Sequence, residues 1–247
     1  MVLAASTVMA SPVGSLAAGG GPYTRGTSGF DVSYPQCGSS LPNGKFGIVG
    51  VNNGRPTFYQ PAYQHVNPCL SGEYSHWAAH ALYINTGYDP SYTDSNHVTP
   101  GCSSSSSGIA GNAAQKAAWA AGCSEASMSS QYANSVGATN PSAWWLDVEI
   151  ANSWSSSDLS LNQYTIQGIV TTLHQLSTGP VGVYSTSYQW ATIVGNGFHP
   201  TGVNADWYAT GTRSAKSAKA YCGRTGFSGD PVWLVQFVNT FDQNYVC

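Results

Sequence analysis

Short and uniformly apolar runs recur along this chain, and they constrain its fold more than any other feature. Each run has the length of a β-strand, yet none shows the apolar–polar alternation of a strand with one face in water. Such runs are typical of strands buried on both faces, as in a parallel sheet. The runs are residues 29–33, 46–51, 80–84, 144–149, 181–184, 205–209 and 232–237.

Helix-like stretches separate several of these runs. Residues 111–122 are rich in alanine, and residues 159–176 place leucine, isoleucine and valine at mostly helical spacing. Strands that alternate with helices predict an α/β fold, here a single (β/α)8-type TIM-like barrel of seven or eight strands with helices missing near the C-terminus. A doubly wound open sheet is the alternative, but no G-x-G-x-x-G or G-x-x-x-x-G-K-[ST] motif follows any run.

The N-terminal residues differ in character from the rest. Residues 1–18 are small and apolar, as at the end of a secretory signal that lacks its basic start; a disordered tail is the alternative. We predict a signal-peptide remnant and Gly-rich lead over residues 1–28 and one barrel domain over residues 29–247. Residues 101–108 contain five consecutive serines and are expected to form a loop inserted on the barrel rim.

Charge and cysteine content indicate a secreted protein. The net charge is −3, from 11 acidic and 8 basic residues, which argues against nucleic acid or an acidic membrane as a partner. No apolar run is long enough to span a membrane. The six cysteines form no C-x-x-C pair, so we expect disulfides made in an oxidising compartment. Fifteen pairings are open, and pairing of neighbours in order would give Cys37–Cys69, Cys102–Cys123 and Cys222–Cys247.

Four acidic residues stand where a barrel enzyme carries its active site. Asp147 and Glu149 are two residues apart at the carboxyl end of the most apolar run, and side chains two apart on a strand share a face. Asp31 lies at the end of the first run, and Asp242 follows the last run. Active sites of such barrels gather at the carboxyl ends of the strands. The first and last strands of a closed barrel are neighbours, so we expect these four acids to meet at one mouth.

Paired carboxylates suit proton transfer. Their mutual repulsion raises the pKa of one, which can then donate a proton to a leaving oxygen near neutral pH. The structural alternatives are a capping pair or a buried salt bridge for Asp147 and Glu149, an Asp-turn for Asp31 and ordinary loop chemistry for Asp242.

Aromatic residues near the strand ends favour a carbohydrate ligand. Sugar rings present C–H faces that stack on indole and phenol rings, although each aromatic taken alone is also explained by core packing. The six histidines form no H-E-x-x-H motif, and His76 and His80 would share a helix face only if the following run were not a strand. We therefore predict no metal and no cofactor. The aromatic set is Trp144, Trp145, Trp154, Tyr184, Tyr188, Trp190, Trp207 and Trp233.

Taken in order, these motifs resemble glycoside hydrolase family 25, the Chalaropsis-type lysozymes. The stretch from Gly29 to Gln36 resembles the family's opening Gly-hydrophobic-Asp-Val-Ser with a nearby Gln, and Leu146-Asp147-Val148-Glu149 resembles its central Asp-x-Glu strand. Similar matches are Val183-Tyr184-Ser185-Thr186 with Trp190, Trp207-Tyr208-Ala209, Val235-Gln236-Phe237 and Asp242-Gln243-Asn244.

The resemblance implies a glycoside hydrolase that cleaves the β-1,4 bond after N-acetylmuramic acid in peptidoglycan glycan strands, with retention of configuration. We also predict that the protein is a monomer. It implies that Glu149 is the general acid/base and that Asp147 orients the substrate acetamido group or stabilises the cationic transition state. Asp31 and Asp242 would complete the acidic cleft. The nucleophile stays open between a carboxylate and the substrate's own N-acetyl oxygen.

Departures from the family pattern affect the expected substrate more than the fold. After the second run this chain has Asn52-Asn53-Gly54-Arg55-Pro56, and after the third it has Asn85. The predicted substrate-binding residues are Asn52, Asn85, Tyr184, Trp190, Trp207 and Gln236. Two other functions compete with hydrolysis: a barrel that binds carbohydrate without cutting it, or with altered specificity, and a structural or nutritional secreted protein.

Overall fold

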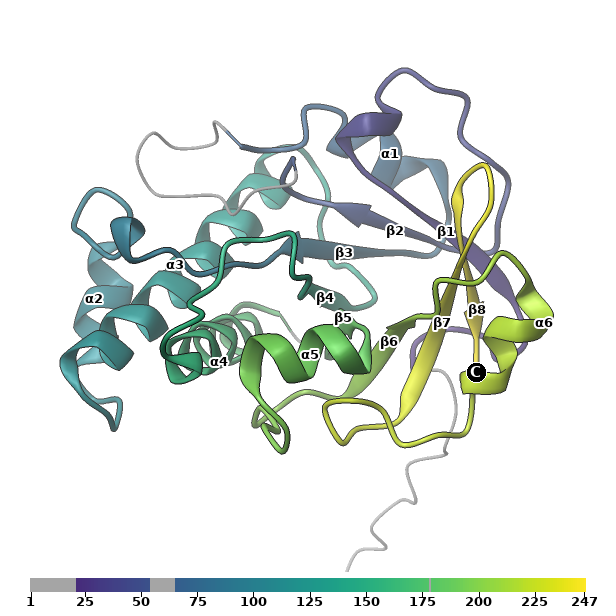
Figure 1. Ribbon diagram of the computed structural model, residues 1–247. Coiled ribbons are helices and arrows are strands. Elements are labelled where there is room, and N and C mark those ends of the chain that lie inside the picture. Colours follow the sequence, from purple (N-terminus) through teal and green to yellow (C-terminus); the bar gives the residue numbers. More distant parts are fainter. Residues whose placement is uncertain (1–20, 54–64, 178) are drawn as a thin grey trace, which may run out of the picture.

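Eight strands close into a barrel in the computed structural model, which describes residues 21–53, 65–177 and 179–247 (Figure 1). The predicted signal remnant, residues 1–18, and the departure at Arg55-Pro56 lie outside these residues. The strands follow one another around the barrel in chain order, so the predicted single barrel is confirmed and the open sheet is not. They are β1 Ser28–Val32, β2 Gly47–Gly50, β3 His80–Asn85, β4 Trp144–Asp147, β5 Val181–Ser185, β6 Ala205–Ala209, β7 Val232–Val238 and β8 Asp242–Val246.

The last strand corrects the sequence prediction in two respects. Strands β1 to β7 are parallel, but β8 runs antiparallel to both β7 and β1 and closes the barrel between them. Asp242 was expected in a loop after the last strand, whereas it is the first residue of β8 and the register partner of Asp31. The sequence Asp-Gln-Asn-Tyr-Val hides this strand, because three polar residues begin it.

Helices cover the barrel unevenly, and the prediction that some are missing is confirmed. The β1–β2 connection holds only the 3-10 turn η1, Tyr34–Gln36, and no helix separates β7 from β8. In Figure 1 the large helices α3 and α4 lie on one side of the barrel, away from α6 and the C-terminus. The helices are α1 Leu70–His76, α2 Pro100–Ser106, α3 Ala113–Ser135, α4 Leu159–Leu176, α5 Ser187–Val194 and α6 Ala215–Ala218, with the 3-10 turns η2 Pro90–Tyr92 and η3 Lys219–Tyr221.

The serine-rich segment is helical, not the predicted loop. Thr99 caps α2 by accepting a hydrogen bond from the Cys102 backbone N–H, and Pro100 occupies its first turn. Cys102 is buried and forms a disulfide with Cys123 of α3. A cap and a covalent link to a long helix therefore hold serines that alone have little preference for a helix.

The alanine-rich helix α3 extends 13 residues past the predicted end at residue 122. Its buried face consists mainly of Ala, Gly and Ser, which give little hydrophobic contrast along the sequence. The predicted helix 159–176 coincides with α4, whose first turn is capped by Asp158 through the Ser160 backbone N–H.

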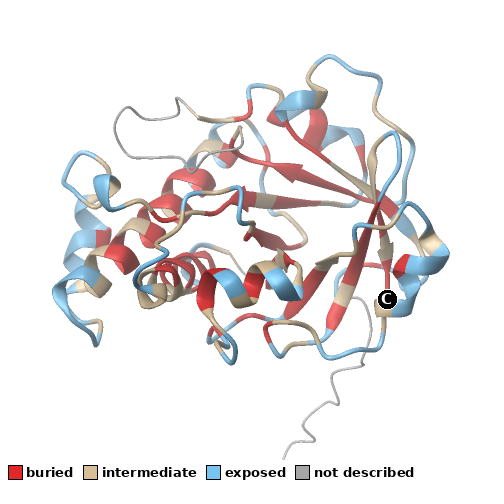
Figure 2. Ribbon diagram, viewed as in Figure 1, coloured by how far each residue is buried: buried red, intermediate tan, exposed pale blue. Residues whose placement is uncertain are grey.

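The strands are buried on both faces, as the uniform runs predicted (Figure 2). Alternate residues point into the barrel, where Ile48, Trp145, Trp207 and Leu234 belong to one cluster. The intervening residues, such as Val49, Leu82 and Leu146, pack in a second and larger cluster with the helices. This apolar layer fills the inside of the barrel. The polar residues that follow on the same faces of the strands therefore lie at the carboxyl ends of the strands.

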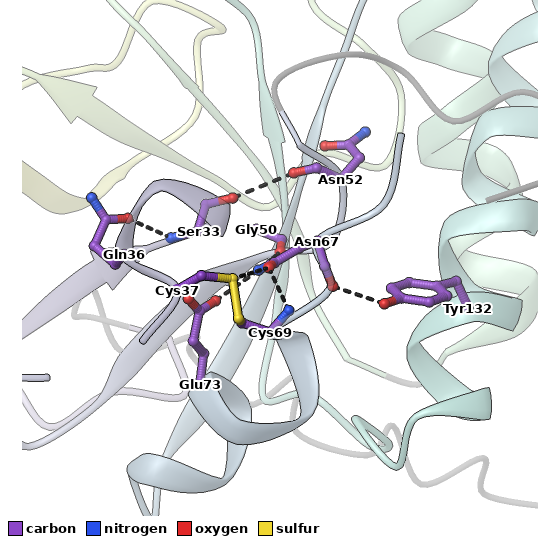
Figure 3. The surroundings of a disulfide bond; sticks show 9 residues. All are labelled: Ser33, Gln36, Cys37, Gly50, Asn52, Asn67, Cys69, Glu73 and Tyr132. Carbon is purple, nitrogen blue, oxygen red and sulfur yellow. Dashed lines mark hydrogen bonds between the residues drawn. A yellow bond between two sulfur atoms is a disulfide. The ribbon is translucent and has the colours of Figure 1, made fainter. Parts of the chain in front are cut away.

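Three disulfides tie the connections together. They join Cys37 to Cys69 (Figure 3), Cys102 to Cys123 and Cys222 to Cys247, which confirms the pairing of neighbours in order. Within the described residues, no helix combines the length and the apolar character that crossing a membrane requires.

Candidate active site

Four carboxyl groups meet at the carboxyl end of the barrel. Asp31 of β1, Asp147 of β4, Glu149 just beyond β4 and Asp242 of β8 line one hollow of about 130 Å³. Strand alternation points Asp147 and Glu149 to the inside, and the antiparallel β8 brings its first residue to the end where the parallel strands finish. The other residues that line this hollow are Tyr83, Tyr184, Trp207 and Gln236, and none of the eight lining residues is a Lys, Arg or His.

Two side-chain amides donate hydrogen bonds to Asp31, and two aromatic side chains orient these amides. Gln236 Nε2 donates to both carboxylate oxygens at 3.1 Å, and Asn244 Nδ2 donates to Oδ1 at 2.7 Å. The two amides are themselves oriented, because Tyr184 Oη donates to Gln236 Oε1 at 2.8 Å and Trp207 Nε1 donates to Asn244 Oδ1 at 2.7 Å. Burial and the nearby Asp242 charge still raise the pKa of Asp31 to about 7.

The raised pKa of Asp31 predicts that the folded protein loses stability as pH rises. The folded state holds this proton up to about pH 7, whereas the unfolded chain releases it near its ordinary value of 3.8. Stability from this group is therefore complete below the unfolded value and is lost as pH rises through the folded one. Buried Asp206, whose pKa is also raised to about 7, acts in the same direction.

The measurement is the thermal unfolding midpoint from about pH 4 to about pH 8. We expect the midpoint to fall across this range, and to fall less steeply in Asp31→Asn. Asp94→Asn is the control, because the Asp94 carboxyl is exposed and has a lowered pKa through its hydrogen bond to His97. Equal slopes in the wild type and Asp31→Asn would contradict the raised pKa.

Asp147 and Glu149 lie together in the acidic hollow. Asp147 is buried and accepts from Asn85 Nδ2 at 3.1 Å through Oδ2, while its Oδ1 has no amide or hydroxyl donor within the described part of the chain. The pKa of Asp147 is raised mainly by its burial and also by the negative charge of Glu149. Burial also raises the pKa of the half-buried Glu149. Two carboxyl groups that interact in this way titrate as a pair.

Glu149 is positioned by two residues that follow its strand. Gln189 Nε2 of α5 lies 3.5 Å from Glu149 Oε1, and Gln189 Oε1 accepts from the Ile150 backbone N–H at 2.7 Å. Trp154 Nε1 donates to the Glu149 carbonyl at 2.7 Å. Gln189 therefore contacts the glutamate side chain and Trp154 fixes its backbone, and no salt bridge to Glu149 occurs among the described residues.

The predicted substrate-binding residues divide into those at the cleft and those away from it. Tyr184, Trp207 and Gln236 line the acidic hollow, and Asn85 lines an adjoining one. Asn52 is a correction: it is buried, donates to the Asn85 carbonyl and to Glu125, and accepts from the Asn85 N–H. It therefore fixes the end of β3 from behind.

Trp190 is the second correction, because it also lies away from the cleft. Its side chain is buried in the outer layer, where it packs against Phe198 and Phe227. Trp190 belongs to α5, and the helix turns this ring toward the barrel wall and away from the mouth.

Three residues at the site were not among those predicted from the sequence. Tyr83 lines the hollow, Asn244 donates to Asp31 and Gln189 contacts Glu149. Strand alternation could have found Tyr83 and Asn244, which are two residues from Asn85 and Asp242. No local signal marks Gln189, because its contact depends on where α5 packs.

Comparisons with known proteins agree with this geometry. A family model described as Lysozyme-like protein 1 matches residues 118–223, a segment that contains Asp147 and Glu149 but neither Asp31 nor Asp242. No curated protein sequence matches this chain.

Solved structures share the fold at low sequence identity. A muramidase from Acremonium alcalophilum superposes with a TM-score of 0.55 at 15% identity, covering 90% of this chain and 93% of that one. A bacterial lysozyme from Streptomyces coelicolor gives 0.53 at 14% identity, covering 91% and 93%. A family 25 glycosyl hydrolase from Bacillus anthracis gives 0.52 at 10% identity, covering 90% and 89%. This chain therefore shares the fold of these structures, and residues 118–223 are similar to a lysozyme-like family model.

Proposed function

We propose that this protein is a muramidase-like glycoside hydrolase that cleaves β-1,4 glycan bonds of bacterial peptidoglycan. The observation that carries the proposal is the placement of Asp147 and Glu149 together in a hollow lined by two further acids and no base. A buried acid that stays protonated near neutral pH is what the departure of a sugar leaving group requires. The fold shared with muramidases and a lysozyme supports peptidoglycan as the substrate.

Glu149 is the general acid/base of this proposal. It is more exposed than Asp147 and can reach a glycosidic oxygen in the cleft, while Asp147 is only 8% exposed. Burial raises the pKa of both acids, and the Glu149 charge raises that of Asp147 further, which favours the protonated form that a general acid needs. An acetamido N–H that donates to Asp147 would favour its ionised form and so leave the proton to Glu149.

Asp147 then acts as a positioning residue for the acetamido group. Asp147 is buried and accepts a hydrogen bond from Asn85 at 3.1 Å, which suits holding an acetamido group better than attack on an anomeric carbon. This placement favours attack by the substrate's N-acetyl oxygen, with retention, over nucleophilic attack by Asp147.

Asp31 and Asp242 supply negative potential below the sugar ring. Asp31 is held by Gln236 and Asn244, and the two acids lie side by side as register partners of β1 and β8. An oxocarbenium-like transition state carries positive charge, so Asp242 when ionised, and Asp31 as it ionises near its raised pKa of about 7, stabilise it more than the neutral substrate. The reaction needs carboxylates alone, so we propose no metal and no cofactor.

We also propose that the protein acts outside the cell as a monomer. Three disulfides are typical of proteins from oxidising compartments. The low charge and the open cleft suit a solid, polymeric substrate met outside the cell.

The test incubates purified protein with suspended bacterial cell walls. Hydrolysis is expected to release soluble glycan fragments while the protein stays folded. If the protein sediments with the walls but releases no fragments, it is a carbohydrate-binding barrel and not a hydrolase. If the protein neither binds the walls nor releases fragments from them, peptidoglycan is not its substrate.

A further inference from the structure

Half of the basic side chains of this protein lie in one short segment. Of its eight Lys and Arg residues, four fall within residues 213–224, and residues 207–229 contain no acid. The rest of the chain carries the other four bases and all eleven acids. A protein with a net charge of −3 therefore has one strongly positive segment, residues 213–224, which we call the cationic segment. Its bases are Arg213, Lys216, Lys219 and Arg224.

The four cations of this segment face solvent. Each is exposed, and the described residues form no salt bridge with any of them. Two lie over aromatic rings: Lys219 Nζ is 4.0 Å from the centre of the Tyr245 ring, and the Arg224 guanidinium is 4.6 Å from the centre of the Tyr221 ring. These contacts orient the two cations but leave their charge in place.

The cationic segment is a fixed part of the barrel wall. Helix α6 and the turn η3 pack against β7, and buried Ala218 belongs to an apolar cluster with Val232 and Val235. The disulfide between Cys222 and Cys247 ties the segment to the residue that follows β8. In Figure 1, α6 lies beside β7 and β8, across the barrel from α3 and α4. The backbone that carries the charges is thus placed before any partner arrives, which lowers the entropy cost of binding.

The segment begins at the mouth of the barrel. The Val238 N–H donates to the Thr212 carbonyl at 2.8 Å, and the Thr210 hydroxyl donates to the Gln236 carbonyl at 2.6 Å. The side chain of Gln236 lines the acidic hollow. Arg213 is the next residue after Thr212, so the first cation stands beside the end of β7, close to the proposed active site.

The charge distribution indicates a partner that is anionic and thread-like. Exposed Lys and Arg side chains attract phosphate groups. A flat anionic membrane would also meet the acidic remainder of the protein and be repelled by it, whereas a polymer chain can follow the cationic segment alone. The acidic hollow repels the same polymer, so the mouth stays free for a glycan.

The segment offers no ring on which a nucleobase could stack. Proteins that bind single-stranded nucleic acid combine cations with aromatic side chains that stack on the bases. Here the rings of Tyr221 and Tyr245 are only half-exposed and lie against Arg224 and Lys219. Residues 213–224 are all described, and they include no exposed large hydrophobic side chain. The surface therefore suits a phosphate chain without bases.

We propose that the cationic segment binds a polyol-phosphate chain, a phosphodiester polymer without bases, on the same bacterial wall whose glycan the cleft would cut. The inference rests on the proposed function for the source of the polymer. Binding of phosphates by four exposed cations releases counterions, so the affinity falls as salt rises. A protein held on the wall in this way meets the glycan at a raised local concentration.

The test measures the Kd for bacterial walls by sedimentation. The walls either keep their phosphodiester polymers or have been stripped of them with hydrofluoric acid, and every protein carries Glu149→Gln so that the walls stay uncut. Adding Arg213→Gln and Lys216→Gln together is expected to weaken binding to untreated walls roughly 10-fold and to lower its salt dependence. Binding to stripped walls should be weaker and should not respond to these substitutions.

The matched control combines Lys45→Gln and Lys116→Gln, which remove the same charge outside the segment. Lys45 precedes β2, and Lys116 belongs to α3, where its Nζ donates to the Ser107 carbonyl at 3.1 Å. This variant should bind untreated walls as the parent protein does. An equal loss in both double variants, or equal binding to untreated and stripped walls, would overturn the proposal.

Soluble competitors identify the kind of polyanion. Linear polyphosphate is expected to displace the protein from untreated walls, and single-stranded DNA with the same number of phosphates should do so no better. Displacement by the DNA at a much lower concentration would assign the segment to nucleic acid. Binding to vesicles of anionic lipid that is lost with Arg213→Gln and Lys216→Gln would assign it to a membrane. Either result would overturn the polyol-phosphate chain as the partner.

The outcomes keep this proposal and the proposed hydrolase apart. Wall binding that depends on Arg213 and Lys216, with no release of fragments by the unsubstituted protein, would keep the cationic segment and reject the hydrolase. Release of fragments by a protein that binds untreated and stripped walls equally would keep the hydrolase and reject the segment.

Discussion

Replacing Glu149 with glutamine is expected to lower kcat on peptidoglycan by at least roughly 10²-fold, because a positioned general acid contributes about 10²- to 10⁴-fold. Glutamine keeps the size of the side chain and can still bond to Gln189, but it carries no proton that a glycosidic oxygen can take. KM and binding to cell walls should change little, since the substituted atom acts in the transition state. The measurement is the initial rate of soluble fragment release.

The control for this variant is Glu73→Gln, the same substitution in a buried acid outside the cleft. Glu73 accepts from Asn67 at 2.7 Å, and glutamine can still accept this hydrogen bond. Its activity should match the wild type. A Glu149→Gln protein with the thermal stability and the turnover of the wild type would remove Glu149 from the role of general acid.

Replacing Gly168 or Gly122 with alanine is expected to destabilise the fold by about 1–3 kcal/mol each. Helices α3 and α4 cross so closely that a Cβ on Gly122 would lie 2.0 Å from the Thr165 carbonyl oxygen. A Cβ on Gly168 would lie 2.2 Å from the Trp119 carbonyl oxygen. Backbone atoms cannot swing aside as side chains do, so the helices must separate and lose packing.

Gly72→Ala is the matched control for the crossing. Gly72 also lies in a helix, α1, but no heavy atom would come within 4 Å of a Cβ there. Its substitution should stabilise the protein by about 0.4–1 kcal/mol through lower entropy of the unfolded chain. The measurement is the free energy of unfolding in urea. Equal effects at Gly72 and Gly168 would contradict the close approach of the two helices.

The barrel could be predicted because the residues of most strands are apolar in themselves, so that each strand is recognisable from its own short sequence. Runs such as residues 144–149 are apolar throughout, and the helix 159–176 shows its own period. The same local signals fail where tertiary contacts decide. Strand β8 begins with three polar residues, of which Asp242 lines the cleft and Asn244 donates to Asp31, and helix α2 is held by a cap and a disulfide.

The site was predictable to the extent that alternation and barrel closure determine it. Both place Asp31, Asp147, Glu149 and Asp242 at one mouth, where the structure brings them together. The supporting residues follow from packing across the fold. Asn52 and Asn85 look alike in sequence, since each directly follows an apolar run, yet Asn52 donates to Glu125 and Asn85 to Asp147. Only the placement of α3 behind β2 and β3 separates their roles.

The identity of the reducing ends released from peptidoglycan tests the central claim most directly. Digests by the wild type and by Glu149→Gln would be reduced and analysed by mass spectrometry. We predict muramic acid at the reducing ends with the wild type and no such fragments with Glu149→Gln. Reducing ends of N-acetylglucosamine, or the same fragments from both proteins, would contradict a muramidase that uses Glu149 as its acid.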